Sequence, residues 1–223
     1  MGFPLKVTTP SGDESREPYI LRVAGWTEAR YFKEAPETRL AEFEDGEVIM
    51  HSPAGTRHQQ VVAFLTFLLR GYVRARDLGE VLNGPAVVRL RPGLAYEPDI
   101  FVVGRDQLGQ LGEQYLAGAP ALVVEVVSSG TRSHDLKTKA TAYRKHRVKE
   151  YWAVDPEQRI LARYRPSAHA TAAYRVTRHA TGRLTSTALP GFWVEASWLW
   201  QASLPSEVDC LDQILGRVAT RKH

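Results

Sequence analysis

The feature that most constrains the fold is an uninterrupted apolar run, PALVVEVV, at residues 120–127. Continuous runs rich in Val and Leu are typical of strands buried on both faces, so this segment predicts a central strand of a sheet. One residue inside the run, Glu125, carries a charge. Burying a carboxylate is costly unless it pairs with a cation or binds a metal. Glu125 therefore marks either a functional site or an ion pair that anchors the sheet.

Helical and extended patterns alternate around this strand. We expect one helix starting near Thr27 and further helices over 57–77, 135–147 and 206–219. Strands are expected over 84–90, 98–103, 120–127 and 150–154. A hairpin is expected over 159–165 and 172–178, and two short strands joined at Asp45-Gly46 are expected within 40–50. This order predicts an α/β fold with a central mixed β-sheet flanked by α-helices. We expect an N-terminal extension at 1–25, one domain at 26–200 and a C-terminal helix within 201–223.

Composition excludes several classes of protein. The one cysteine, Cys210, excludes a disulfide framework and a zinc cluster built on cysteines, and it fits a reducing compartment. No apolar run approaches the roughly 20 residues that span a bilayer, and no secretion signal is evident, so we expect no membrane partner and a cytoplasmic protein. Motifs of the P-loop, dinucleotide-binding, zinc-protease and α/β-hydrolase types are missing from the sequence.

The net charge of +4 is unevenly distributed along the chain. Residues 128–183 contain 13 Lys and Arg against 4 Asp and Glu, an excess of +9 that begins just after Glu125. A concentrated basic segment indicates either a polyanionic partner such as nucleic acid or a solvated surface.

Two further ionisable residues accompany Glu125. Asp99 follows Pro98 at the start of an apolar strand, and Lys139 comes four residues after Asp135 on the next helix. Two carboxylates on adjacent strands would form an oxygen-rich site for magnesium or manganese, and a nearby ammonium could stabilise a phosphate. Taken singly, Asp99 could also cap its strand, and Lys139 could lie on a solvated helix face.

Four segments of the chain together carry a family resemblance. They are AEFEDGEVIMHSPAGTRH at 41–58, PDIFVV at 98–103, LVVEVVSSGTRSHDLKTKATAYRKHRVKEYWAVDP at 122–156, and ALPGFWVEASWLW at 188–200. Over about residues 26–200 the chain resembles the Uma-two family of restriction-endonuclease-like proteins, within the PD-(D/E)XK nuclease superfamily. The resemblance implies a restriction-endonuclease-like core and a magnesium- or manganese-dependent endonuclease that hydrolyses phosphodiester bonds of DNA, with RNA not excluded.

The resemblance also implies roles for individual residues. Asp99 and Glu125 match the metal-binding carboxylates. The usual lysine of the superfamily stands two residues after the glutamate, where this chain has Val127. The Uma-two pattern places its lysine on the following helix, and Lys139 matches that position. A lysine tip reaches about 6 Å from its backbone, so the ammonium can serve the same site from there.

Other matches are accessory. Glu47 and His58 match recurring family positions and are expected to assist catalysis, and Glu42 is a further match. We expect nucleic-acid contacts from hydroxyl and basic side chains that follow Glu125, namely Ser128, Thr131, Arg132, Lys137 and Arg144. For Ser128, Thr131 and Arg132, a plain turn and helix cap is an equal or better alternative.

Val127 keeps a second function open, that of a nuclease-fold module that binds nucleic acid without cleaving it. A protein-binding scaffold is a third. A homodimer is expected because breaking two strands needs two sites. The terminal stripe Val208, Leu211, Leu215 and Val218 is expected to pack on its own domain, with a dimer interface as the alternative.

Overall fold

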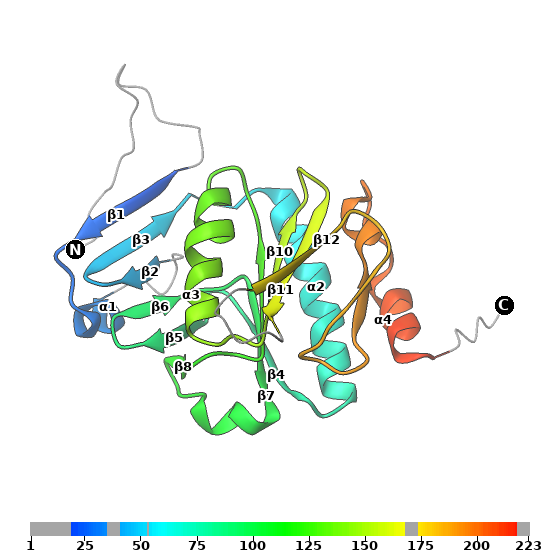
Figure 1. The fold of residues 1–223 in the computed structure, drawn as a ribbon, viewed down its shortest axis with the longest axis horizontal. Helices are drawn as coiled ribbons and strands as arrows, with labels where there is room; N and C mark the ends of the chain where they lie inside the picture. Colours follow the sequence, from blue (N-terminus) through cyan, green and yellow to red (C-terminus); the bar gives the residue numbers. More distant parts are fainter. Residues whose placement is uncertain (1–18, 35–40, 53, 168–173, 218–223) are drawn as a thin grey trace, which may run out of the picture.

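The structure is a computed structural model that describes residues 19–34, 41–52, 54–167 and 174–217. Two six-stranded mixed sheets, with helices packed on them, make up the fold (Figure 1). This confirms the predicted α/β class with a mixed sheet flanked by helices. It also adds a second large sheet that the sequence pattern did not indicate.

The central sheet contains the strand predicted from the apolar run. Across it lie β12 (Tyr174–His179), β11 (Ile160–Pro166), β10 (Glu150–Asp155), β9 (Leu122–Val126), β7 (Ile100–Gly104) and β4 (Gly79–Asn83). β9 pairs in parallel with β10 and antiparallel with β7, so it lies inside the sheet. Every residue of β9 is buried, as its continuous apolar sequence requires.

The second sheet, here called the N-terminal sheet, is built largely of antiparallel pairs. Across it lie β1 (Ile20–Ala24), β3 (Glu47–His51), β2 (Ala41–Glu44), β6 (Leu94–Tyr96), β5 (Val87–Arg91) and β8 (Tyr115–Ala117). β2 and β3 are the two strands expected around Asp45 and Gly46, and both of these turn residues have positive φ, as a tight hairpin requires.

Several strands of the two sheets depart from the sequence prediction. β1 falls within the expected extension, yet it pairs with β3 along the sheet edge, while residues 1–18 lie outside the described residues. β4 and β6 were not predicted, and the strand expected at 84–90 begins only at Val87. Short strands of mixed polarity are fixed by their partners in the sheet rather than by their own pattern.

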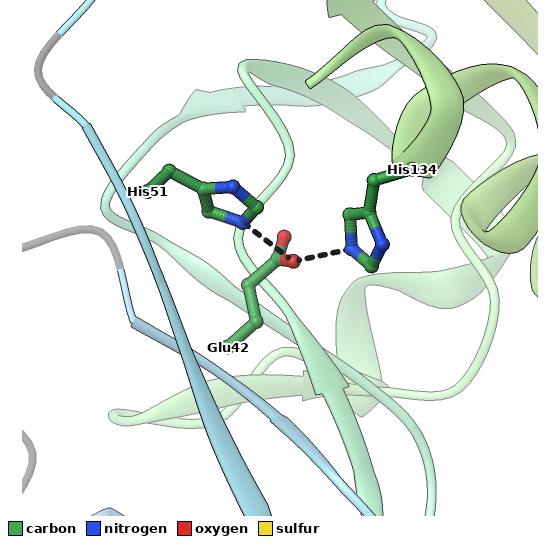
Figure 2. A group of neighbouring side chains, drawn as sticks. All are labelled: Glu42, His51 and His134. Atoms are coloured by element: carbon green, nitrogen blue, oxygen red, sulfur yellow. Dashed lines mark hydrogen bonds and ion pairs between the residues drawn. The ribbon is translucent and has the colours of Figure 1, made fainter. Parts of the chain in front are cut away.

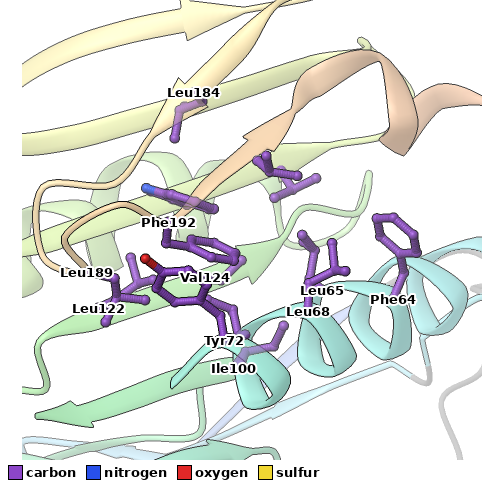
Figure 3. Close-up of a cluster of buried hydrophobic side chains, with 14 of the residues drawn as sticks. Phe64, Leu65, Leu68, Tyr72, Ile100, Leu122, Val124, Leu184, Leu189 and Phe192 are labelled. Carbon is purple, nitrogen blue, oxygen red and sulfur yellow. The ribbon is translucent and has the colours of Figure 1, made fainter. Parts of the chain in front are cut away.

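Helices cover both faces of the central sheet. α2 (Thr56–Ala75), α4 (Glu207–Leu215), the 3₁₀ turn η3 (Ala196–Trp200) and the β13–β14 pair (Arg183–Thr185, Trp193–Glu195) lie on one face. Figure 3 shows Phe64, Leu65, Leu68 and Tyr72 of α2 packed with Ile100, Leu122, Val124, Leu184, Leu189 and Phe192. No helix in the described part of the chain is long and apolar enough to cross a membrane.

The opposite face carries the N-terminal sheet, the π-helical turn η2 (His134–Lys139) and α3 (Ala140–Lys145), which together occupy the helix predicted at 135–147. The helix α1 (Glu28–Glu34) packs on the N-terminal sheet, and η1 (Arg105–Gln110) follows β7. Alternation along β9 sends Val124 toward α2 and Val123 toward α3. Glu125 shares the second face, so its carboxylate lies between the central sheet, η2 and the N-terminal sheet.

The terminal helix packs on its own domain, and the packed face includes Leu211 and Leu215 of the predicted stripe. Cys210 and Ile214 are the buried residues of α4, whereas Val208 is 57% exposed. Leu211 lies so close to α2 that a Cβ at Gly71 would overlap it, which explains why glycine suits that helix crossing. The fourth residue of the predicted stripe, Val218, lies outside the described residues.

Candidate active site

A cavity of about 50 Å³ lies where β9, the start of β7, η2 and the N-terminal sheet meet. Its volume accommodates more than one water-sized occupant. Ionisable side chains dominate the lining, which includes Glu42, Glu97, Asp99, Glu125, Asp135, Lys139, His51 and His58. These residues come from segments spread over about a hundred positions of the chain.

Asp99 and Glu125 hold each other in place through the backbone. Asp99 Oδ2 accepts a hydrogen bond from the Val126 amide at 2.7 Å, and the Asp99 amide donates to Glu125 Oε2 at 3.3 Å. This reciprocal pair ties the start of β7 to the end of β9. The two carboxylates predicted to share a site are therefore neighbours in the structure.

Lys139 reaches the same place from η2. Its Nζ lies 2.9 Å from Glu125 Oε1 and 2.6 Å from Glu42 Oε1, and Asp135 Oδ1 is 3.8 Å away. The Tyr143 hydroxyl donates to Glu125 Oε1 at 2.7 Å. Asp135 and Lys139 are both buried in this π-helical turn.

The Glu42 carboxylate has a second set of partners beside Lys139. Figure 2 shows it between two imidazole rings, with His51 Nε2 3.1 Å and His134 Nε2 3.2 Å from Glu42 Oε2. The Glu97 amide donates to Glu42 Oε1 at 3.3 Å. Glu42 is fully surrounded, with a side chain only 1% exposed.

Negative charge exceeds positive charge around the cavity. Five carboxyl groups line it, against one lysine and two histidines. Burial raises the pKa of Glu125 to about 8 although the charge of Lys139 opposes it, and burial also raises the pKa of Glu97 to about 8. Burial therefore favours the protonated form of both carboxyl groups near neutral pH.

Two groups of the cavity keep their charge despite burial. Burial alone would raise the pKa of Glu42, but the Lys139 charge and the hydrogen bonds from His134 and His51 hold that pKa well below its usual range. Burial would likewise lower the pKa of Lys139, yet Glu125, Glu42 and Asp135 keep it well above its ordinary value. Lys139 is therefore an ammonium that donates hydrogen bonds.

His58 lies at the more open side of the cavity, whereas Glu47 lies away from it. His58 Nε2 is 3.2 Å from Asp99 Oδ2, and these two side chains are 13% and 16% exposed. Although burial lowers the pKa of His58, the hydrogen bond and charge of Asp99 raise it above its ordinary value. The Glu47 carboxylate instead pairs with Arg22 at 3.0 Å on the outer part of β3.

The five residues expected to contact nucleic acid are divided between two places. Ser128 and Thr131 line the cavity, with hydroxyl oxygens 3.0 Å apart. Arg132 is already bound by two carboxylates: it pairs with Asp155 and lies 2.8 Å from Glu157.

Lys137 and Arg144 point away from the cavity. Lys137 is exposed and lines a separate hollow beside the hairpin turn of the N-terminal sheet, and Arg144 is half-buried on α3. Both belong to the basic segment, but neither is brought to the carboxylates.

Sequence reasoning missed His51, His134 and Glu97 and undervalued Glu42. The signal for Glu42 was present, since an acid stands between Ala41 and Phe43 in a short apolar strand. The histidines gave no comparable signal, because their approach to Glu42 depends on the packing of η2 against the N-terminal sheet.

Comparison with known proteins shows the family of this chain. A family model described as Uma2, putative restriction endonuclease, matches residues 28–198. The chain belongs to the Uma2 family. The match confirms the resemblance carried by the sequence, and it spans every cavity residue named above.

A solved structure shares the Uma2 chain's fold. It is described as a putative nuclease belonging to DUF820 from Anabaena variabilis, with a TM-score of 0.60 and 17% sequence identity, and the alignment covers 76% of this chain and 94% of that one. At this identity the likeness establishes the fold alone. No match is found among curated proteins.

Proposed function

We propose that this Uma2 protein is a metal-dependent endonuclease that hydrolyses phosphodiester bonds of DNA. The observation that carries the proposal is the convergence of Asp99, Glu125 and Lys139 on one cavity, with Lys139 Nζ 2.9 Å from Glu125 Oε1. Membership of a family described as putative restriction endonucleases supports the same reaction class.

The donor set fits a hard divalent cation. Asp99 and Glu125 offer carboxylate oxygens, the ligands that magnesium and manganese prefer, and the surrounding acids lack positive charge. These two residues would hold the ion. When bound, such an ion polarises the scissile phosphate and lowers the pKa of the attacking water.

The side chains of the chain supply positioning and charge. The Lys139 ammonium stabilises the negative charge that develops on the phosphate. Because its pKa is raised, Lys139 stays protonated and does not act as a general base. His58, held by Asp99, donates a hydrogen bond to a phosphate oxygen at the open side of the cavity. Glu42 keeps Lys139 in position at 2.6 Å. Glu47 has no part in this proposal.

Substrate reaches the cavity from the side of Asp99 and His58, because these are less buried than Glu125 and Lys139. Ser128 and Thr131 on the same lining offer hydroxyls to the phosphate backbone. Exposed basic residues of the 128–183 segment, such as Lys137, supply the sequence-independent part of the affinity.

The test is nicking of supercoiled plasmid in Mg²⁺, Mn²⁺ or EDTA. We expect the wild type to cleave only with a divalent cation and Lys139→Ala to lose at least about 100-fold, the usual cost of removing a transition-state donor. The matched control is Lys33→Ala, an exposed lysine of α1 outside the basic segment. A wild type that cleaves neither DNA nor RNA, or a Lys139→Ala variant as active as the control, refutes the proposal.

A binding module that does not cleave is the second candidate, favoured by the buried Val127 at the usual lysine position. It predicts salt-dependent DNA binding without turnover, and metal-dependent cleavage excludes it. We also propose that the protein is cytoplasmic, because the buried, free Cys210 suits a reducing compartment. We further propose a homodimer, because breaking two DNA strands needs two sites. Sedimentation as a monomer at micromolar concentration contradicts the dimer.

A further inference from the structure

Glu42, His51 and His134 form a cluster that the nuclease proposal does not use in full. They come from β2, β3 and η2, and their side chains are 1%, 8% and 4% exposed. Both imidazole Nε2 atoms point at one oxygen, Glu42 Oε2, from opposite sides (Figure 2). The three potential ligand atoms all lie within 4.8 Å of one another.

We propose that Glu42, His51 and His134 form a second metal site that binds a divalent transition-metal ion of the Zn²⁺ type. It is separate from the oxygen-rich Asp99–Glu125 site. It does not depend on cleavage, because its ligands and its test involve no substrate.

The geometry suits a small transition-metal ion. For ligand bonds of about 2.1 Å, neighbouring ligand atoms stand about 3.0 Å apart in an octahedral site and about 3.4 Å apart in a tetrahedral one. The two nitrogen–oxygen separations, 3.1 and 3.2 Å, lie within that interval. Only the two rings, whose centroids are 5.5 Å apart, must close toward each other when the ion binds.

The donor types decide which ion is favoured. Imidazole nitrogens suit Zn²⁺, Co²⁺, Ni²⁺ and Fe²⁺, whereas Mg²⁺ prefers oxygen ligands and keeps much of its water. Two histidines and one carboxylate are a recurrent set for such ions, with further positions left for water. Glu42 and His51 line the cavity, which gives the ion a path to the cluster.

Negative charge around the cluster favours a cation there. Glu42 is ionised, and the carboxyl groups of Asp99, Glu125 and Asp135 line the same cavity. Lys139 stays bound to Glu42 Oε1, so the second ion takes Oε2, the oxygen that faces the two rings.

An ion here ties the N-terminal sheet to η2. His134 and Lys139 belong to the same turn, so fixing His134 also fixes the segment that delivers Lys139 to Glu125. The role of the second ion is therefore to position the lysine and to strengthen the contact between the two sheets.

The test measures Zn²⁺ binding to the full chain by calorimetry in an Asp99→Asn background, which weakens the first site. His51→Gln and His134→Gln keep an N–H donor near the Nε2 position, so they preserve the hydrogen bond to Glu42 but coordinate metal poorly. We expect one Zn²⁺ per chain in the background protein and at least about a 100-fold loss of affinity in either Gln variant. The matched control is His179→Gln, a histidine of β12 that contacts Thr177.

The same affinity in the Gln variants as in the control overturns the site, and so does the lack of Zn²⁺ binding in the Asp99→Asn background. X-ray absorption on the Zn²⁺-loaded wild type needs no variant and keeps the test decisive if a Gln variant fails to fold. Two imidazole ligands support the site, and fewer than two refute it. Neither result depends on whether the protein cleaves DNA.

Discussion

Two buried glutamates on neighbouring strands are stabilised in opposite ways. Glu150 begins β10 and faces α2, whereas Glu125 lies in β9 and faces η2. Glu150 Oε1 accepts from Trp152 Nε1, and Oε2 accepts from Ser186, Thr187 and Ala188 at 2.7–2.9 Å. All of these donors are neutral. Glu125 has Lys139, Tyr143 and one amide as donors, and other carboxylates around it.

The difference separates an anchor from a site. A buried carboxylate surrounded by neutral donors has its charge fully solvated by the protein and needs nothing more. A buried carboxylate among other carboxylates is short of positive charge until a cation joins it. Glu150 therefore holds the start of β10 to the 186–188 loop, whereas the surroundings of Glu125 support the proposal that it binds a cation.

The largest effect is expected for Glu150→Ala. The change leaves the Trp152, Ser186, Thr187 and Ala188 donors buried without an acceptor, so we expect a loss of about 3–5 kcal/mol of unfolding free energy. Urea unfolding measures it. The matched control Glu157→Ala, on an exposed carboxylate, should cost less than about 1 kcal/mol. Equal losses in the two variants would remove the distinction between the two glutamates.

Glu125→Gln should show the reverse behaviour. Cleavage is expected to fall at least about 100-fold, because a metal carboxylate is lost. Without metal, the free energy of unfolding should stay the same or rise. Lys139 remains paired with Glu42, and the neighbouring carboxylates no longer face the negative charge of Glu125. Plasmid nicking and urea unfolding in EDTA measure the two effects. A destabilisation of more than about 2 kcal/mol would make Glu125 an anchor like Glu150.

Arg132 is predicted from the sequence to contact DNA, but in the structure it pairs with carboxylates of its own chain. Its guanidinium spans Asp155 and Glu157, so Arg132→Ala should cost about 1–2 kcal/mol of stability, mainly through the buried Asp155. The exposed Lys137→Ala should instead weaken DNA binding and reduce its salt dependence by about one ion. Urea unfolding and DNA binding at increasing salt are measured on both variants. If Arg132→Ala weakens DNA binding and leaves stability unchanged, Arg132 is a DNA contact as first predicted.

The smallest effect concerns a partly exposed pair. Arg89 holds the Glu28 carboxylate with two contacts of 2.8 and 2.6 Å, and this hydrogen bonding lowers the Glu28 pKa. Because the folded-state pKa is depressed, the pair stabilises the fold above about pH 4.5 and the contribution disappears as pH falls through the lowered pKa. Glu28→Gln should cost about 0.5–1 kcal/mol at pH 7 and less in acid, measured by urea unfolding. A pH-independent cost contradicts this.

The sequence predicted the central elements of this fold and the core of its site. The apolar run gave β9, and the spacing of Asp135, Lys139 and Tyr143 put three polar groups on one side of a helical segment, where Lys139 and Tyr143 both contact Glu125. These predictions rest on local periodicity, which the structure preserves.

Features that depend on long-range packing were not predictable. The N-terminal sheet joins β2 to β6 and β5 to β8 across many residues, and the His51–Glu42–His134 cluster forms only when that sheet meets η2. Glu150 was overlooked for the same reason, because its acceptor role depends on a loop 36 to 38 residues downstream.

The central claim, that the acids around Glu125 are kept for a divalent cation, is tested most directly by Mn²⁺ binding followed by electron paramagnetic resonance. We expect one Mn²⁺ that Mg²⁺ displaces, with affinity at least about tenfold weaker in Asp99→Asn and in Glu125→Gln and unchanged in Glu157→Gln. The same Mg²⁺-displaceable affinity in all four proteins would contradict it.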